Sequence, residues 1–224
     1  DHQGDRGRDG RERISHYLFR FGQGTSPVPY STGWIAQWKF NTRTASDREH
    51  YNMPSREYLE LWFPDNDQGP FFEMDDRHTI NDGGGRQTSS DAFLRAPPNG
   101  SPLLGADKEQ FRYYFTPRGG NTFDEWGPLL ELCRTMTPGQ LPDEEFDERI
   151  FEILNVEEVL RVWSIRLNTG DWDTWGYDRG KNCYWYLPPD SGRWVLLPWD
   201  MELSYERSVS ERLPPAVSRA SNPS

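Results

Sequence analysis

Oxygen-bearing side chains stand at the ends of aromatic segments in the last third of the chain. Asp173 precedes an aromatic segment that Asn182 opens, and Asp200 follows a second apolar segment. Residues at strand ends are held more rigidly than residues on free loops. Mg²⁺ binds one or two carboxylates together with phosphate oxygens and water. The pattern therefore predicts a site for a metal and a phosphate at the ends of two strands.

The two segments are expected to form a β-hairpin. Cys183 to Leu187 and Arg193 to Leu197 flank a turn rich in Pro and Gly, which is typical of two antiparallel strands. Asn182 and Asp200 would then lie side by side. Asp173, on the preceding loop, would be placed to orient a substrate hydroxyl, the task that phosphoryl transfer asks of a carboxylate.

Helices are expected ahead of this region. Apolar residues at helical spacing predict helices over Asp124 to Met136 and from Asp143 through Leu154. Asn155, followed by Glu158, resembles an N-cap that starts a third helix. That helix would carry Val159 inward and would lead directly into the segment with Asp173.

The first half of the chain is expected to be rich in strands. Alternating apolar residues predict strands over Ile14 to Phe21, Tyr58 to Phe63 and Pro70 to Met74. Phe111 to Phe115 is a further strand candidate, and Trp34 to Phe40 is a short strand or helix. Strands followed by helices and a hairpin favour an α+β protein of two lobes with a cleft between them.

The domain is expected to cover residues 14–207. Residues 1–13 mix Gly, Asp and Arg without an apolar period, so they are expected to be disordered or a linker. Residues 208–224, rich in Ser and Pro, are expected to be a flexible tail. The chain begins without Met, which suggests an excised segment.

The composition limits the possible partners. The 224 residues carry a net charge of −11, with an isoelectric point near 4.9. Such a surface repels nucleic-acid backbones and favours basic protein partners. No apolar run approaches the roughly 18 residues that span a bilayer, so no transmembrane segment is expected. Six of the ten Trp residues fall between Trp163 and Trp199, which favours an aromatic core over a sugar-binding platform.

Cysteine and histidine offer little chemistry. Cys133 and Cys183 permit at most one internal disulfide, and their disulfide state is left open. His16, His50 and His78 are scattered, without the spacing of a metal site or a triad, so surface or structural roles are expected.

The motifs of the last third resemble those of the spore coat protein H (CotH) kinase family, atypical relatives of protein kinases. The resemblance lies in the order of four motifs, which are Asp171-Trp172-Asp173, Asn182 to Leu187, Pro189 to Arg193, and Pro198-Trp199-Asp200-Met201-Glu202. It covers about Phe111 to Tyr205, and it extends to a strand pair between Tyr58 and Asp75.

The resemblance implies a bilobal fold similar to protein kinases, with a helical C-terminal part that contains a β-hairpin metal site. It implies ATP and Mg²⁺ as cofactors and Asp173 as the catalytic aspartate. The metal-binding residues implied are Asn182, Asp200 and Glu202. Glu73 or Asp75 would pair with a nucleotide-binding basic residue, for which Lys39 and Arg20 are the candidates.

Several departures from the family leave alternatives open. The chain has only three lysines, and Asp171 and Asp178 compete with Asp173. The closing helices of the family are not matched, so the kinase fold would be incomplete or inactive. The alternatives are a non-catalytic, pseudokinase-like surface module, a carbohydrate-binding module, and a glycosidase that uses Asp173 and Glu202 as its carboxylate pair.

The resemblance also implies a partner and a location. The partner would be a protein substrate, basic and rich in Ser, that accepts phosphate on Ser or Thr. The location would be the spore coat, the cell surface or the secreted fraction.

Overall fold

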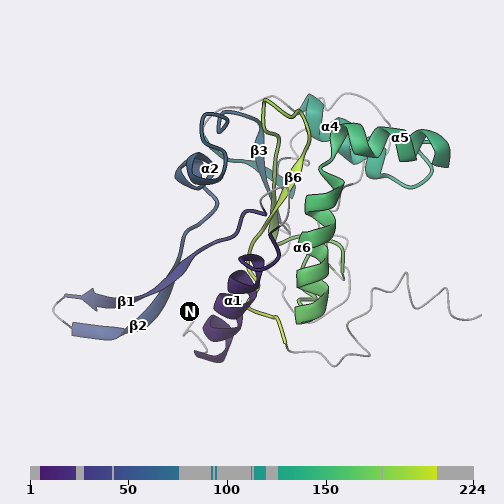
Figure 1. Cartoon of the computed structure of the whole chain (residues 1–224). Coiled ribbons are helices and arrows are strands. Elements are labelled where there is room, and N and C mark those ends of the chain that lie inside the picture. Colours follow the sequence, from purple (N-terminus) through teal and green to yellow (C-terminus); the bar gives the residue numbers. More distant parts are fainter. Residues whose placement is uncertain are drawn as a thin grey trace, which may run out of the picture.

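The computed structural model describes residues 6–23, 28–41, 43–75, 92, 94, 112, 114–119, 126–177 and 179–205. These residues form an α+β fold (Figure 1). The helices are α1 (Arg6–Phe19), α2 (Arg56–Trp62), α4 (Gly127–Met136), α5 (Asp143–Ile153) and α6 (Val156–Thr169). The strands are β1 (Gly33–Phe40), β2 (Arg43–Tyr51), β3 (Phe71–Met74), β4 (Phe115–Pro117), β5 (Cys183–Tyr186) and β6 (Val195–Pro198).

A four-stranded antiparallel sheet forms the centre of the fold. Its strand order is β4-β3-β5-β6. Successive side chains of a strand point to opposite faces, so each face receives its own apolar cluster. Tyr184 and Tyr186 of β5 lie in one cluster with Tyr58 and Leu59 of α2, whereas Trp185 lies in the other cluster, with residues of α4, α5 and α6. Both faces of the sheet are therefore covered.

Tryptophan rings fill the larger of these two clusters. Trp175 contacts Trp163 and Trp185, each with 5.0 Å between ring centroids. Trp175, Trp185 and Trp194 are buried. Buried rings supply apolar area to the core, so these three do not form an exposed sugar-binding platform.

The outer edge of β6 is covered by the start of α6. The Trp194 amide donates to the Ile153 carbonyl at 2.8 Å, and the Asn155 amide donates to the Trp194 carbonyl at 2.9 Å. Farther along, the Leu196 amide donates to Glu158 Oε2 at 3.0 Å. These bonds satisfy backbone groups that an open sheet edge would leave exposed, and they fix α6 against the hairpin.

The strands β1 and β2 form a separate hairpin. They pair antiparallel with each other, from Gly33 opposite Tyr51 to Phe40 opposite Arg43. In Figure 1 this hairpin extends away from the central sheet. Residues at its tip are therefore distant from the ends of β5 and β6.

The expected second helix, third helix and hairpin are confirmed. The helix α5 begins at Asp143, and β5 and β6 form the antiparallel pair after it. The Asn155 side chain accepts a hydrogen bond from the Glu158 amide at 3.4 Å, as expected for the N-cap of α6. The return strand expected over Pro70 to Met74 is β3.

The strand predicted over Ile14 to Phe21 is wrong, because residues 14–19 belong to α1 and Arg20 and Phe21 lie in the turn after it. The strand prediction placed Tyr17, Phe19 and Phe21 on one face, but Phe19 is buried while Tyr17 and Phe21 are exposed. The helix begins at Arg6, where the sequence predicted a disordered or linker segment up to residue 13. A short apolar segment fits the two-residue period of a strand as well as the 3.6-residue period of a helix, so the alternation did not distinguish the two.

The strand predicted over Tyr58 to Phe63 is also wrong, since α2 occupies it. Ser55 is the N-cap of this helix, and its hydroxyl accepts from the Tyr58 amide at 3.4 Å. Ser55 with its neighbouring Pro was the signal that could have predicted the helix start. Of the strand candidate ending at Phe115, only this last residue is in a described strand, because Arg112 and Tyr114 are helical.

Several expectations concern residues outside the described part of the chain, including His78, Asp178 and the tail over residues 208–224. Cys133 and Cys183 are both buried free thiols. Among the described helices, none is long and apolar enough to cross a membrane.

Candidate active site at the ends of β3, β5 and β6

The strand register brings the predicted residues to one end of the sheet. Met74 lies opposite Cys183, and Cys183 lies opposite Pro198. Asp75 and Asn182 each lie one residue beyond this row, and Asp200 lies two residues beyond it. Because neighbouring strands are about 4.8 Å apart, the backbones of these residues lie close together.

Asp173 and Asn182 contact each other directly. Asn182 Nδ2 donates to the Asp173 carbonyl oxygen at 2.7 Å and to Asp173 Oδ2 at 3.0 Å. Asn182 has φ of 59°, a left-handed conformation that Asn tolerates better than most residues. This turn of the backbone directs the Asn182 amide toward the loop that carries Asp173.

Two cations flank the Asp173 carboxylate. Arg179 Nη1 lies 3.3 Å from Oδ1, and Lys181 Nζ lies 3.3 Å from Oδ2. Burial raises the pKa of Asp173 to about 6, and Lys181 and then Arg179 counteract this rise. A carboxylate with a pKa near neutral is suited to accept a proton. The sequence analysis did not assign roles to Lys181 or Arg179.

Arg166, on the last turn of α6, holds the site together. Its Nε lies 2.5 Å from Asp171 Oδ2. Its Nη1 donates to the Asn182 carbonyl at 2.8 Å, and its Nη2 donates to the Trp199 carbonyl at 2.7 Å. The side chain is buried, so these bonds replace its contacts with water. Sequence analysis missed Arg166, although it lies seven residues after Val159, on the inward face of α6.

Asp171, a competing aspartate, has a structural position. It is fully buried, burial raises its pKa, and Arg166 counteracts the rise. Its contact with the Arg166 guanidinium fixes the loop after α6 to the helix. Of these two aspartates, Asp173 is therefore the candidate for a reactive position.

Asp200 and Glu202 follow β6 on a turn. Asp200 is partly exposed and has φ of 48°, and its carbonyl oxygen lies 3.5 Å from Arg166 Nη2. The Glu202 carbonyl accepts from Arg11 Nε at 3.1 Å, which connects the turn to α1. The structure thus brings the backbone of Asp200 beside Asn182 through Arg166, and Glu202 lies farther along the turn.

Glu73 lies on the same strand as Asp75 and has a basic partner that the sequence analysis missed. Arg118, just after β4, donates to Glu73 Oε2 through Nε at 2.9 Å and through Nη2. The Tyr184 hydroxyl donates to Glu73 Oε1 at 3.1 Å. Glu73 is buried, whereas the Arg118 side chain is about one-third exposed (36%), so a buried acid holds a cation at the surface.

The two basic candidates from sequence lie elsewhere. Lys39 pairs with Thr44 near the tip of the β1–β2 hairpin. Arg20 is exposed just after α1, with its guanidinium 5.9 Å from the Tyr17 ring centroid. Within the part of the chain that the structure describes, Glu73 forms an ion pair with Arg118 and none with Arg20.

The donor set fits a metal that also binds a phosphate. Among the described residues, no group of three or more His, Cys, Asp or Glu side chains is arranged to hold a metal by itself. Asp200 and the Asn182 amide are one carboxylate and one neutral oxygen donor. Mg²⁺ commonly takes so few protein ligands because substrate oxygens and water complete its shell.

The sheet and the helices that cover it define an α+β protein with oxygen-bearing side chains at the ends of its strands. The family model described as "CotH kinase protein" matches residues 77–221, well over half of the chain, and the chain therefore belongs to the CotH kinase family. Asp173, Asn182, Asp200, Glu202 and Arg118 lie within the matched residues, whereas Glu73 and Asp75 precede them. No curated protein matches the chain.

Proposed function

We propose that the protein transfers a phosphoryl group from ATP to Ser or Thr of a protein substrate, with Mg²⁺ as cofactor. The observation that carries this proposal is the contact between Asp173 and Asn182. Asn182 precedes β5 at the end of the sheet where β6 finishes, and Asp200 follows β6 there. Phosphoryl transfer needs positioned oxygen ligands and a residue that orients the attacking hydroxyl, and little covalent work from the protein.

In this proposal each residue has one role. Asp200 and the Asn182 side chain hold the metal, with Glu202 as a further candidate. When bound, the metal neutralises charge on the phosphate oxygens. Asp173 accepts the proton of the substrate hydroxyl, and its pKa of about 6 supports that role. Arg166 positions both strand ends without touching the substrate.

We propose that Arg118 supplies the basic group for the nucleotide phosphates. Glu73 holds its guanidinium through Nε and Nη2, and the side chain is partly exposed. Arg presents its donors in a planar fork that matches phosphate oxygens. Lys39, near the tip of the β1–β2 hairpin, and Arg20, just after α1, were the candidates from sequence, and this proposal gives the role to Arg118 instead.

The substrate is proposed to be a basic, Ser-rich protein of a spore coat or cell surface. The net charge of −11 favours Lys and Arg around the acceptor residue. The location follows from the family resemblance, in which coat association is part of the family name.

The test is transfer of labelled phosphate from ATP to a Ser-rich basic protein. Asp173→Asn is expected to lower transfer by about 100-fold or more, the usual contribution of a general base, while binding of Mg-ATP persists. Asp190→Asn, on the exposed turn between β5 and β6, is the matched control and is expected to leave transfer unchanged. Transfer by Asp173→Asn at the wild-type rate would contradict the assigned role.

A non-catalytic, pseudokinase-like module is the second candidate, and one observation favours it. Both oxygens of Asp173 are engaged by side chains, and only 7% of the residue is exposed. Such a carboxylate serves as a structural anchor unless the loop opens for substrate. Binding of Mg-ATP by the wild type without any transfer would identify this second function.

A further inference from the structure

The helix α1 has two opposite faces with different surroundings. Ser15, His16 and Phe19 are buried, and α1 contacts α6. The opposite side carries a set of exposed apolar residues that we call the α1 face. Its members and their exposed fractions are Ile14 (53%), Tyr17 (53%), Leu18 (37%) and Phe21 (71%).

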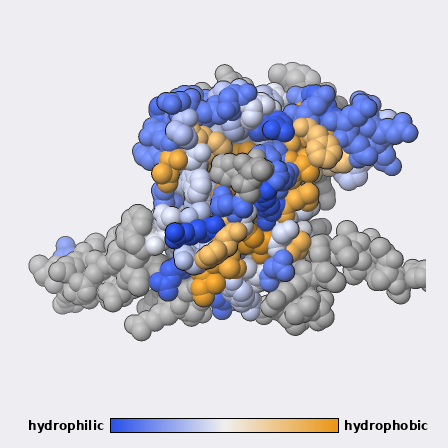
Figure 2. Space-filling model, in the orientation of Figure 1, coloured by the Kyte–Doolittle hydropathy of each residue, from blue (hydrophilic) through white to orange (hydrophobic). Residues whose placement is uncertain are grey.

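The α1 face is a continuous stripe. Its members follow the spacing i, i+3, i+4 and i+7, which places Ile14, Tyr17 and Leu18 on one side of α1. Phe21, in the turn after α1, continues the stripe, and its amide donates to the Leu18 carbonyl at 3.0 Å. At 3.6 residues per turn, the centre of this stripe lies about 160° from the centre of the buried face. The stripe is about 10 Å long, or two turns. In Figure 2 an apolar patch with polar side chains beside it lies over the position of α1.

The more apolar side of α1 thus points to solvent. A surface helix usually turns its apolar stripe to the core and its polar side to water. Exposed large apolar residues elsewhere on described helices are more isolated, such as Leu61 on α2, Phe151 on α5 and Leu160 on α6. Contiguous exposed apolar patches with polar rims mark interaction sites. The α1 face therefore has the form of a docking surface.

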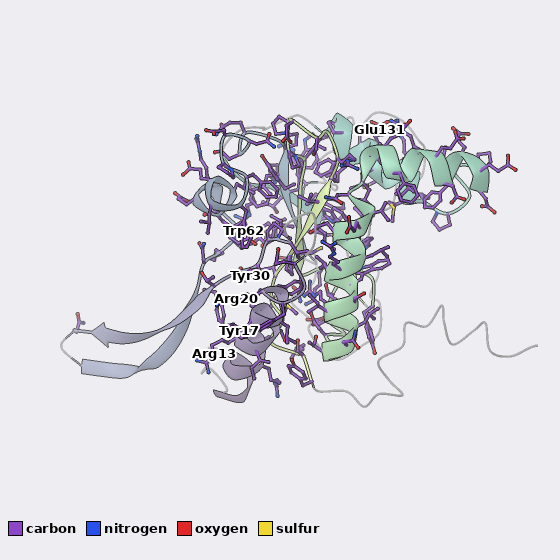
Figure 3. The ribbon with its side chains drawn as sticks, viewed as in Figure 1. Arg13, Tyr17, Arg20, Tyr30, Trp62 and Glu131 are labelled. Atoms are coloured by element: carbon purple, nitrogen blue, oxygen red, sulfur yellow. The ribbon has the colours of Figure 1, made fainter. Side chains whose placement is uncertain are left out.

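Charge beside the stripe indicates the chemistry of the partner. Arg13 and Arg20 are exposed and seven residues apart, so both lie along the same edge of the stripe, next to Tyr17. Figure 3 labels these three residues near one another, along α1 and just after its end. The Arg20 guanidinium lies 5.9 Å from the Tyr17 ring centroid. Tyr and Arg are residues that frequently anchor protein interfaces.

We propose that the α1 face binds an amphipathic helix of a partner protein, one that carries acidic residues beside its own apolar stripe. An apolar stripe of two turns matches the contact between two crossing helices. The acidic residues of the partner would complement Arg13 and Arg20. This inference does not depend on the proposed phosphoryl transfer.

Two other occupants fit less well. In an antiparallel pair of two α1 helices, Arg13 of one copy would face Arg20 of the other, and like charges oppose such pairing. An anionic membrane would attract the arginines but would repel a chain of net charge −11. A helix with acidic flanks meets neither objection.

The experiment uses the full chain and a synthetic amphipathic peptide of about 18 residues, five turns of helix, with Leu at the spacing i, i+3, i+4 and i+7. One version carries Glu beside the Leu stripe and a matched version carries Lys. Fluorescence anisotropy is expected to show tighter binding of the Glu peptide by about tenfold or more. Arg20→Glu is expected to reverse this preference, which mere loss of folding would not do.

Apolar contact is tested separately. Phe21→Ser is expected to weaken binding of the Glu peptide by about tenfold. Leu160→Ser, which changes an apolar residue on α6 that is also more than half exposed, is expected to leave binding unchanged. Equal affinity for both peptides, no binding of either, dimerisation through α1 in sedimentation, or binding only to vesicles that contain phosphatidylserine would overturn the proposal.

Discussion

The environment of Asp173 combines burial with two neighbouring cations. Burial disfavours the charged carboxylate, while Lys181 and Arg179 favour it, and the result is a pKa of about 6. Such a group loses its proton just below neutral pH. A base of this kind is ionised at the pH of most cells and still retains affinity for a proton.

The pH dependence of transfer follows from this pKa. Because a base must first lose its own proton, kcat/KM is expected to rise with pH through about 6 and then to level off. Lys181→Met removes the cation that lowers the pKa of Asp173 most, so this pKa should increase and the midpoint should move to higher pH. The measurement is kcat/KM against pH for both proteins. An unchanged midpoint in Lys181→Met would contradict the assignment.

At the residue scale, the sequence predicted the oxygen-bearing residues near the strand ends but not the arginines that contact this part of the sheet. Asp173, Asn182 and Asp200 could be selected because they are acidic or amide residues before or after aromatic segments. Arg166 and Arg118 could not, because an arginine in a helix or after a short strand usually lies in solvent. Their partners come from distant segments, which only the folded chain brings together.

At the scale of elements, the site depends on how α6 is joined to the hairpin. Arg166 bonds to Asp171 and to the carbonyls of Asn182 and Trp199. Glu158, at the other end of α6, accepts from the Leu196 amide. The helix therefore holds the start of β5, the end of β6 and the loop before them in one arrangement.

Removal of Arg166 alone should lower the free energy of unfolding more than removal of both Arg166 and Asp171. Arg166→Met leaves the buried Asp171 carboxylate without its cation, so the free energy of unfolding should fall by about 3–5 kcal/mol. Asp171→Leu in the same chain removes that charge and should recover part of the loss. Urea denaturation of the two variants measures the difference. A double variant less stable than Arg166→Met would contradict this account.

The sequence predicted the later elements better than the early ones. The helices α5 and α6 have strong start signals, an acidic first turn and the Asn155 cap, and the hairpin has a Pro- and Gly-rich turn. The apolar parts of α1 and α2 are short, and their aromatic residues fit a strand as well as a helix. Their helical form is set by burial of Phe19, Tyr58 and Leu59.

At the scale of the whole molecule, the candidate site includes residues that precede the family match. The strand β3 ends at Met74, before residue 77, yet it pairs with β5 and contributes Glu73 and Asp75. The α1 face and the β1–β2 hairpin also precede the match. The two-lobed arrangement implied by the resemblance stays a prediction, and its nucleotide cleft would have to lie beside the ends of β3, β5 and β6.

The central claim is that Asn182 and Asp200 hold Mg²⁺ for a nucleotide, and Asp200→Asn is the appropriate variant to test it. Asp200 has φ of 48°, and Asn tolerates this left-handed conformation, whereas Ala would add strain of about 1–2 kcal/mol. Asn also keeps the size of the side chain. Asp190→Asn, on the exposed turn of the same hairpin, is the control for a lost surface charge.

The most direct measurement is calorimetric titration of ATP into these three proteins, with and without Mg²⁺. The wild type and Asp190→Asn are predicted to bind ATP only when Mg²⁺ is present. Asp200→Asn is predicted to bind Mg-ATP more weakly by about tenfold or more, equivalent to 1.4 kcal/mol. The claim would be contradicted if Asp200→Asn and the wild type bound Mg-ATP with equal affinity. It would also be contradicted if the wild type bound ATP equally well with and without Mg²⁺.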